Sequence, residues 1–250
     1  MSVAVIKDRR EMTVNAVRLP HQRGAVLYAC SSCDTEAVAG QRASRMADKI
    51  QLVSILLEHL AGMEGSPWTG GRFSNRAAYP IQVVRGPLGR PRLLLGEDQG
   101  PAISFSEGGG NVWAALCGDE PDIGIDVAGA DEFQKEYPFH RVFHPQELQH
   151  ALSLTDGDLE SASALLWSIK EAVVKALGCA FHLVDQRQIT VYPSGAAGGN
   201  GEYTLPVGLS GKALVRFPLA ARGSLWVRSR SQGRMWLSIA VLSRRPTGVE

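Results

Sequence analysis

The sequence predicts an α+β protein made of two similar-sized halves, and three observations point to this fold class. Apolar residues make up 44% of the 250 residues and charged residues 20%, so the chain can bury a sizeable core. Segments with helical periodicity and segments with strand character both occur. Their order of strand, long helix and strands is followed by strand, helices and strands. No repeat is visible in the sequence itself, so the halves, 1–122 and 123–250, are expected to share architecture only.

The first half is expected to contain one long helix and several short strands. The helix covers residues 39–62, where apolar residues recur at helical spacing until Gly62 ends the pattern. The stretch 65–92 is rich in Gly, Pro and Arg and is expected to form loops around a short strand. Three glycines at 108–110 separate two apolar runs and predict a β-hairpin. The strands of this half are expected at 25–30, 81–84, 101–107 and 111–117.

The second half is expected to contain two helices, 144–154 and 160–178, with Gly178 at the C-terminal end of the second. The residues 231–233 (SQG) join two runs of strand character and predict another hairpin. The Gly-rich stretch 193–202 is expected to be a surface loop. The strands of this half are expected at 122–129, 188–192, 212–217, 224–230 and 234–243.

The bulk composition argues against several classes of function. The formal net charge is +1, so no global electrostatic argument favours nucleic acid or an acidic membrane surface as a partner. The N-terminal stretch has no apolar run long enough for a signal peptide, and no segment approaches the length of a membrane span. Four cysteines are too few for a disulfide scaffold in a chain of this length. We therefore expect a soluble, cytoplasmic protein without a nucleic-acid or membrane partner.

The helix at 160–178 carries an acid and a base one turn apart. Lys175 lies about 40° from Glu171 on a helical wheel, and the apolar residues fill the opposite side. Such an i,i+4 pair is ordinarily a solvated surface ion pair worth a few tenths of a kcal/mol. However, Trp167 lies on the same polar side as Glu171, which indicates that this face is partly covered, as in a cleft. Lys170 adds a second cation, so the alternative is a site for a metal ion and phosphates.

The strand at 122–129 places an aspartate between small neighbours. Because side chains alternate along a strand, Gly124, Asp126 and Ala128 share one face. The small neighbours are expected to leave open space around the Asp126 carboxylate. An aspartate of this kind ordinarily faces water at a strand end or caps a turn. It also suits Mg²⁺, which takes few carboxylates, several waters and the phosphates of a substrate.

The two segments together are similar to a known family signature. IGIDVAG at 123–129, followed by WSIKEAVVKALG at 167–178, resembles the paired motifs of the 4′-phosphopantetheinyl transferases. In length and two-half layout the chain is similar to the larger monomeric, surfactin-synthetase-activating type, which acts on carrier proteins of polyketide, peptide and fatty-acid synthesis. Three weaker matches resemble flanking motifs of the family: GRP at 89–91, AISFSE at 102–107 and HRVFHPQE at 140–147.

The resemblance implies a pseudo-dimer of two α+β halves with the active site at their junction. It implies an enzyme that transfers the 4′-phosphopantetheine arm of coenzyme A to a serine of an apo acyl or peptidyl carrier protein, releasing 3′,5′-ADP. Asp126 and Glu171 are the implied ligands of Mg²⁺, with Mn²⁺ as the alternative ion. Glu171 would also remove the serine proton, directly or through a metal-bound water, and Lys175 would neutralise charge on the α-phosphate or leaving group. These three are the expected catalytic residues of a monomeric protein.

Further residues are implied to bind coenzyme A. Lys170 and Lys175 are expected at its phosphates. Arg90, within the GRP segment, is expected at the 3′-phosphate or the pyrophosphate, because its guanidinium fork suits phosphate oxygens. Arg45 in the first long helix and Ser106 in the AISFSE segment match positions that are also assigned to coenzyme A. The ordinary alternative for Arg45 and Arg90 is a solvated surface arginine.

The chain departs from the family pattern at two positions. Ala128 stands where the family often has another acid, which predicts a two-carboxylate metal site with water in the remaining positions. Phe105 stands where the family often has a histidine that contacts a phosphate of coenzyme A, and a phenyl ring cannot donate a hydrogen bond. The second hypothesis is therefore a non-catalytic family member that only binds coenzyme A or a carrier protein. The presence of Asp126, Glu171 and Lys175 favours the enzyme.

Two other patterns suggest different chemistry. The segment CSSC, 30–33, follows a strand and precedes a helix, as a thioredoxin-like redox motif does. No βαβ pattern surrounds it, and no second cysteine pair is spaced for zinc. His140 and His144, with Glu147 nearby, are a candidate metal group, although a loop leading into a helix start is the favoured interpretation of that segment.

Overall fold

The computed structural model describes residues 12–18, 25–32, 41–63, 80–118, 122–134, 136–193, 197–198, 201–222 and 225–243. The helices in these ranges are α1 (Gln41–Gly62), α2 (Phe139–Val142), α3 (Pro145–Leu154), α4 (Leu159–Ala176) and α5 (Gly211–Arg216). The strands are β1 (Asn15–Arg18), β2 (Ala25–Ser32), β3 (Ile81–Arg85), β4 (Pro91–Leu95), β5 (Asp98–Gln99), β6 (Ala102–Gly108), β7 (Asn111–Cys117), β8 (Asp122–Gly129), β9 (Ile189–Val191), β10 (Ala197–Gly198), β11 (Glu202–Leu209), β12 (Leu225–Gln232) and β13 (Met235–Leu242). Short 3-10 turns are η4 (Pro87–Gly89), η5 (Ala130–Glu132), η6 (Gln186–Gln188) and η7 (Pro218–Arg222).

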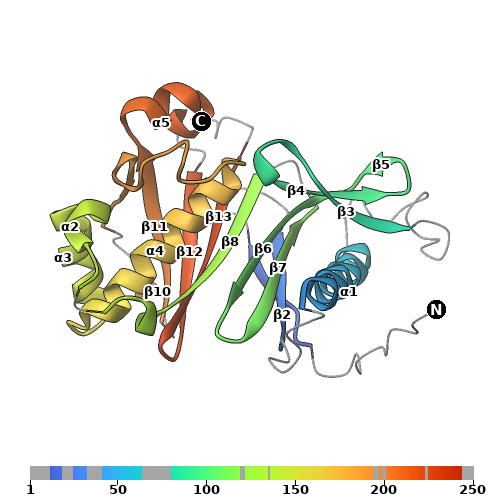
Figure 1. Ribbon diagram of the computed structural model, residues 1–250, viewed down its shortest axis with the longest axis horizontal. Helices are drawn as coiled ribbons and strands as arrows, with labels where there is room; N and C mark the ends of the chain where they lie inside the picture. The colour runs from blue at the N-terminus through green and yellow to red at the C-terminus, as the bar shows by residue number, and fades with distance from the viewer. Residues whose placement is uncertain are drawn as a thin grey trace.

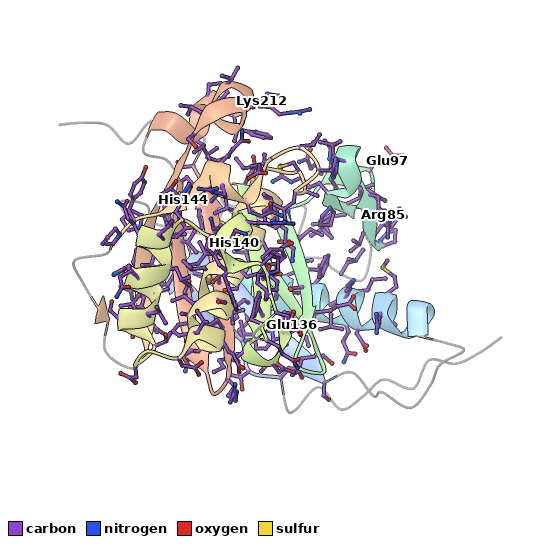
Figure 2. The ribbon with its side chains drawn as sticks, turned by 60° about the vertical axis from the view of Figure 1, so that its left-hand side comes forward. Arg85, Glu97, Glu136, His140, His144 and Lys212 are labelled. Carbon is purple, nitrogen blue, oxygen red and sulfur yellow. The ribbon has the colours of Figure 1, made fainter. Side chains whose placement is uncertain are left out.

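Two antiparallel sheets form the centre of the molecule (Figure 1). The first has the strand order β1-β2-β7-β6, and the second has the order β10-β11-β12-β13-β8, with β9 also pairing with β11. Helix α1 packs on the first sheet and α4 packs on the second, mainly against β8 and β13. Strands β3, β4 and β5 form a separate small sheet, which the labels of Arg85 and Glu97 mark in Figure 2.

An apolar layer joins the two sheets. Val26, Tyr28 and Trp113 of the first sheet are buried in one cluster with Ile125 and Leu237 of the second. The opposite face of each sheet packs against its helix, so the order of layers is helix, sheet, sheet, helix. Strands β6 and β8 lie next to each other where the two sheets meet. This mixture of helices and antiparallel strands confirms the predicted α+β fold class.

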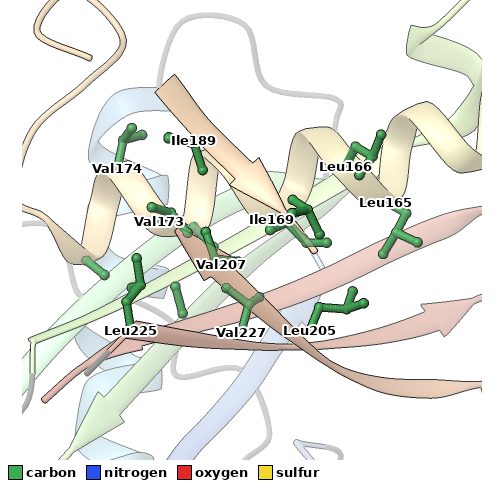
Figure 3. Packing of buried hydrophobic residues seen from close by; sticks show 14 of the residues in the cluster. Leu165, Leu166, Ile169, Val173, Val174, Ile189, Leu205, Val207, Leu225 and Val227 are labelled. Atoms are coloured by element: carbon green, nitrogen blue, oxygen red, sulfur yellow. The ribbon is translucent and has the colours of Figure 1, made fainter. Parts of the chain in front are cut away.

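The core beneath α4 comes from the apolar stripe that the helical periodicity predicts. Leu165, Ile169 and Val173 recur every fourth residue and are buried in one cluster with Val207 and Val227 of the sheet (Figure 3). Burying a side chain of this size contributes about 1.5–3 kcal/mol. The stripe therefore fixes the rotation of α4 about its own axis, and with it the residues that face β8.

Several predicted elements are confirmed by the structure. Helix α1 and the hairpin of β6 and β7 lie where the periodicity and the three glycines place them. The hairpin turn consists of Gly109 and Gly110, with φ angles of 60° and 71°. A two-residue turn with positive φ at both positions favours glycine, since other residues are strained there. Strands β12 and β13 form the second predicted hairpin, with Gly233 in its turn.

The strand predicted at 212–217 is wrong, because this segment contains helix α5. Its short run of apolar residues suggested a strand, but only Ala213 of the helix is buried and Val215 is 83% exposed. The position beside β12 is taken by β11, which the sequence analysis missed because Pro206 and Gly208 disfavour a strand. In β11 the carbonyl of Pro206 accepts a hydrogen bond from the Tyr192 amide.

Candidate functional site

Gly124 allows α4 to pack directly on β8. An added Cβ at this glycine would lie 1.9 Å from the carbonyl oxygen of Ala172 and 2.7 Å from the amide nitrogen of Ala176. The expectation of open space around Asp126 is therefore wrong, because the helix fills that space and Asp126 is buried. The close approach is what brings Lys175 into contact with Asp126.

Gly124→Ala is expected to force α4 away from β8. Because the added methyl group would meet backbone atoms, which cannot turn aside like a side chain, we expect a loss of about 1–3 kcal/mol in the free energy of unfolding. Urea unfolding followed by circular dichroism measures this loss. Gly62→Ala is the matched control, since nothing lies within 4 Å of the position that an added Cβ would take there. Equal effects of the two substitutions would contradict the close-packing interpretation.

Asp126 accepts two hydrogen bonds at one carboxylate oxygen. The Nζ atom of Lys175 donates to its Oδ1 at 2.7 Å, and the hydroxyl of Ser106 donates to the same atom at 2.9 Å. Lys175 also donates to the carbonyl oxygen of Ile125 at 3.1 Å. The site therefore draws on three elements, with Ser106 from β6, Asp126 from β8 and Lys175 from α4.

Two serines of β6 connect the two sheets along the edge of β8. The amide of Ile125 donates to the Ser104 hydroxyl at 3.1 Å, and the amide of Val127 donates to the Ser106 hydroxyl at 3.3 Å. Strand β8 is the last strand of its sheet, so these hydroxyls satisfy backbone groups that lack a strand partner on that side. Ser106 thus positions Asp126 at this contact between β6 and β8, which we call the β6–β8 seam.

Glu171 lies close enough to Asp126 for their charges to interact. Burial raises the pKa of Glu171 above its ordinary value, the negative charge of Asp126 raises it further, and Lys175 partly offsets both effects. Burial also raises the pKa of Asp126, against the opposing effects of Lys175 and Ser106. Two neighbouring carboxylates that are costly to ionise would be stabilised by a bound cation.

The donor set at the seam fits a hard divalent cation such as Mg²⁺. Mg²⁺ is held by one or two carboxylates, together with waters and phosphate oxygens, and Asp126 and Glu171 supply two. No group of three or more His, Cys, Asp or Glu side chains in the described part of the chain is arranged to hold a metal ion. Ala128, where a further acid was considered, is buried in the apolar cluster under α4.

The structure does not bring Lys170 to this site, so its assignment to a phosphate is corrected. Its side chain is 0% exposed and its Nζ lies 2.6 Å from Oε1 of Glu147, which is 1% exposed. The same Nζ donates to the carbonyl oxygens of Gln186 and Ile189 at 2.9 and 2.7 Å. Glu147 in turn accepts from the amide of Val191 at 3.0 Å. Lys170 therefore ties the segment after α4 to the start of α3.

Arg90 lies between the start of β8 and the C-terminal end of α4, and its partner is a carboxylate. Its guanidinium donates to Oδ1 of Asp122 at the start of β8. It also lies beside Gly178, at the C-terminal end of α4. Arg90 is partly buried, which excludes the interpretation as a freely solvated surface arginine. Its assignment to coenzyme A stays a prediction.

Arg45 is placed on α1 beside two residues that the sequence analysis did not assign to the site. Its Nη1 pairs with Oε2 of Glu107 at 2.8 Å, and Lys49, one turn further along α1, pairs with Oε1 of Glu107 at 2.8 Å. The Nζ of Lys49 also lies 5.6 Å from the centre of the Phe105 ring. Two features of the sequence could have identified this cluster. Arg45 and Lys49 have i,i+4 spacing on one helix, and Glu107 directly follows Ser106.

Trp167 is partly buried, as the cleft interpretation required, but by other aromatic rings. Its ring centre lies 5.2 Å from that of Phe181 and 6.2 Å from that of Phe133. Phe133 follows η5, which continues directly from β8. The aromatic cluster therefore anchors the chain leaving β8 against α4, one turn before Glu171.

The two rival patterns lead to no site in the described residues. Cys30 lies inside β2, and burial raises the pKa of its thiol, which is the opposite of a reactive cysteine. Cys33 lies outside the described residues. Glu147 forms an ion pair with Lys170, and Nε2 of His144 donates a hydrogen bond to the carbonyl oxygen of Arg187 at 2.8 Å (His140 and His144 are labelled in Figure 2).

No curated protein sequence matches the chain. Among solved structures, an ACPS-CoA complex from Chronobacterium ammoniagenes is 19% identical, with a TM-score of 0.40, and covers 51% of this chain and 100% of its own. None of the described helices has both the length and the apolar character needed to cross a membrane. Residues 122–205, which carry Asp126, Glu171 and Lys175, match the family model of the 4′-phosphopantetheinyl transferase superfamily.

Proposed function

We propose that the protein transfers the 4′-phosphopantetheine arm of coenzyme A to a serine of an apo acyl or peptidyl carrier protein, releasing 3′,5′-ADP. The observation that carries this proposal is the convergence of Asp126, Glu171 and Lys175 at the β6–β8 seam, within the segment that matches the superfamily model. The superfamily is named for the transfer of this arm. Attack at a pyrophosphate depends on positioning and charge neutralisation, which this group of side chains can supply.

A divalent cation, Mg²⁺ or alternatively Mn²⁺, would be held by Asp126 and Glu171. When bound, it would neutralise charge on the pyrophosphate of coenzyme A. Ser106 and Lys175 hold the Asp126 carboxylate in place through its Oδ1. Lys175 is 28% exposed, so its ammonium can also reach a phosphate oxygen at the edge of the site.

Glu171 is the proposed general base for the serine of the carrier protein. A general base has to be ionised and placed near the proton that it accepts, and a raised pKa makes a carboxylate a stronger base. The neighbouring charge of Asp126 contributes to this raised pKa. Arg90 is proposed to release Asp122 when coenzyme A binds and to pair with one of its phosphates.

The organisation of the chain is consistent with the larger monomeric type of the superfamily. We assign residues 1–122 and 123–250 to two α+β halves that form a pseudo-dimer, with the seam as their junction. The support is that each sheet carries its own long helix, α1 on one and α4 on the other. Action as a monomer in the cytoplasm, without a nucleic-acid or membrane partner, belongs to the same proposal.

The proposed reaction is tested by intact mass spectrometry on a panel of apo carrier proteins. Each carrier is incubated with this protein, coenzyme A and Mg²⁺, and a gain of one phosphopantetheine on any of them supports transfer. The gain should disappear with EDTA. No gain on any carrier, with coenzyme A still bound, would favour a non-catalytic protein that only binds coenzyme A or a carrier, a role suggested by Phe105 and Ala128.

The raised pKa values predict the pH dependence of the reaction. Both Asp126 and Glu171 must be ionised to hold a cation, so kcat/KM should fall as the pH drops through their raised pKa values. We expect the acidic limb above pH 4.5, the ordinary pKa of Glu, and a shift to lower pH when Mg²⁺ is increased. The measurement is kcat/KM against pH at two Mg²⁺ concentrations. A limb below 4.5 that ignores Mg²⁺ would contradict this role.

A further inference from the structure

Three buried serine hydroxyls form a chain between α4 and the sheet beneath it. The hydroxyl oxygens of Ser168 on α4 and Ser238 on β13 lie 2.7 Å apart, and that of Ser229 on β12 lies 2.8 Å from Ser238. All three residues are 0% exposed. A buried hydroxyl is costly unless it is hydrogen-bonded, and here each hydroxyl has a partner in the next. We call this group the hydroxyl chain.

The direction of these hydrogen bonds is fixed at the α4 end of the hydroxyl chain. Ser168 lies 2.9 Å from the carbonyl oxygen of Leu165, and because a carbonyl oxygen can only accept, the one proton of the Ser168 hydroxyl is donated there. Ser168 therefore accepts from Ser238, and Ser238 in turn accepts from Ser229. The chain thus runs from β12 through β13 into the backbone of α4.

The hydroxyl chain lies beside the candidate active site. Ser238 pairs with Asp126 across β13 and β8, so the two side chains are neighbours on the face of the sheet that α4 covers. On the helix, Ser168 precedes Glu171 by three residues, which is about 4.5 Å along the helix axis. The chain therefore joins the sheet to α4 between the two carboxylates of the proposed cation site.

Polar contacts with the sheet recur every seven residues along α4. The indole of Trp236 donates to the hydroxyl of Ser161 at 2.9 Å, Ser168 belongs to the hydroxyl chain, and Lys175 donates to the carboxylate on β8. Seven residues are close to two helical turns, so these contacts follow one line along the helix. Apolar packing is non-directional, whereas a hydrogen bond of 2.7 Å is lost after a displacement of about 1 Å. The line of polar contacts therefore restricts sliding of α4 along its axis.

We propose that Ser238 is a positioning residue for the cation site, and that it acts through Ser168 by fixing where α4 lies along β13. This inference rests on the proposed function. Asp126 is held by the strand that pairs with β13, whereas Glu171 moves with the helix. Distances between a metal ion and its ligands tolerate deviations of about 0.2 Å, so a small slide of α4 would weaken a cation bound by both carboxylates.

The proposal is tested with the triple variant Ser168→Ala/Ser229→Ala/Ser238→Ala. Removing all three hydroxyls leaves none of them without a partner, so the urea midpoint should stay close to that of the wild type. The dissociation constant of Mn²⁺ with saturating coenzyme A, measured by electron paramagnetic resonance, should rise about threefold to tenfold. The transfer rate in intact-mass kinetics should fall about tenfold to hundredfold. Binding of coenzyme A without a metal ion should not change.

Two single substitutions provide the controls. Ser163→Ala removes another buried hydroxyl of α4, which donates to the carbonyl oxygen of Leu159 inside the helix. This variant should keep the Mn²⁺ affinity and the transfer rate of the wild type. Ser238→Ala alone leaves the hydroxyl of Ser229 without its acceptor, so it should lower the urea midpoint as well as the affinity for Mn²⁺.

A stable triple variant that binds Mn²⁺ more weakly than Ser163→Ala does would support the positioning role. Wild-type affinity for Mn²⁺ in the triple variant would overturn it. Parallel losses of stability and Mn²⁺ affinity in the triple variant would also overturn it, because the hydroxyls would then serve the fold alone. Failure of the proposed function looks different, since the wild type would then add no phosphopantetheine to any carrier protein, whatever the Mn²⁺ affinities of the variants.

Discussion

Lys170→Ala is expected to destabilise the fold by about 3–5 kcal/mol, which is the usual cost of leaving one partner of a buried ion pair alone. Lys170 and Glu147 are both removed from solvent. Burial lowers the pKa of Lys170, and the charge of Glu147 opposes that shift. The substitution would also leave the carbonyl oxygens of Gln186 and Ile189 without their donor. Urea unfolding monitored by circular dichroism measures the loss.

A double substitution that also replaces Glu147, the partner of Lys170, provides the control for this prediction. Lys170→Met/Glu147→Leu removes both charges together and should recover much of the lost stability, because a buried ion pair is often replaceable by apolar residues. Lys175→Ala, on the same helix, should destabilise less because Lys175 is partly exposed. A stable Lys170→Ala protein that has lost only its affinity for coenzyme A would restore the phosphate role and contradict the structural one.

Glu171→Gln is expected to lower the rate of phosphopantetheine transfer by about 10²–10³-fold without lowering stability. The amide keeps the shape of the side chain but supplies neither a negative charge for a cation nor a base for the serine proton. Because folding raises the pKa of Glu171, its ionisation disfavours the folded state as the pH rises through that pKa. At neutral pH the uncharged glutamine should therefore leave the free energy of unfolding equal or increase it.

Lys170 and Glu171 are adjacent on α4 but have opposite expected effects, because Lys170 should affect stability and Glu171 should affect the transfer rate. Intact-mass kinetics of carrier modification measure the transfer rate, and urea unfolding of the same protein measures stability. A Glu171→Gln protein that transfers the arm at the wild-type rate would remove Glu171 from the chemistry. A protein that loses rate and stability together would assign Glu171 to the fold, as Lys170 is assigned here.

The sequence connected Asp126 with α4 through the resemblance of both segments to the paired family motifs, whereas the local patterns describe each side chain only on its own element. Strand alternation gives the face of Asp126, and helical spacing places Glu171 and Lys175 together. The sequence did not predict that Lys170 is buried, since nothing local to α4 indicates that Glu147 and two backbone carbonyl oxygens accept hydrogen bonds from it. Long-range contacts of this kind appear only when the segments are packed.

Other differences between the predictions and the structure also arise from long-range packing. Gly124 suggested open space, whereas a helix backbone occupies it, because a glycine signals either a gap or a close approach. The segment containing Val215 has a short apolar run of the kind found in strands, yet β11 already occupies the position beside β12. Lys49 and Glu107 have ordinary surface chemistry in the sequence, and only the adjacency of α1 and β6 makes them a cluster.

The most direct test of the central claim is a titration of Mn²⁺ into the protein with saturating coenzyme A, followed by electron paramagnetic resonance of the free ion. The wild-type protein should bind Mn²⁺ when coenzyme A is present, and both Asp126→Asn and Glu171→Gln should lose most of that binding, whereas the surface variant Lys212→Gln should not. Equal binding of Mn²⁺ by wild type and both carboxylate variants would contradict a cation site at the β6–β8 seam.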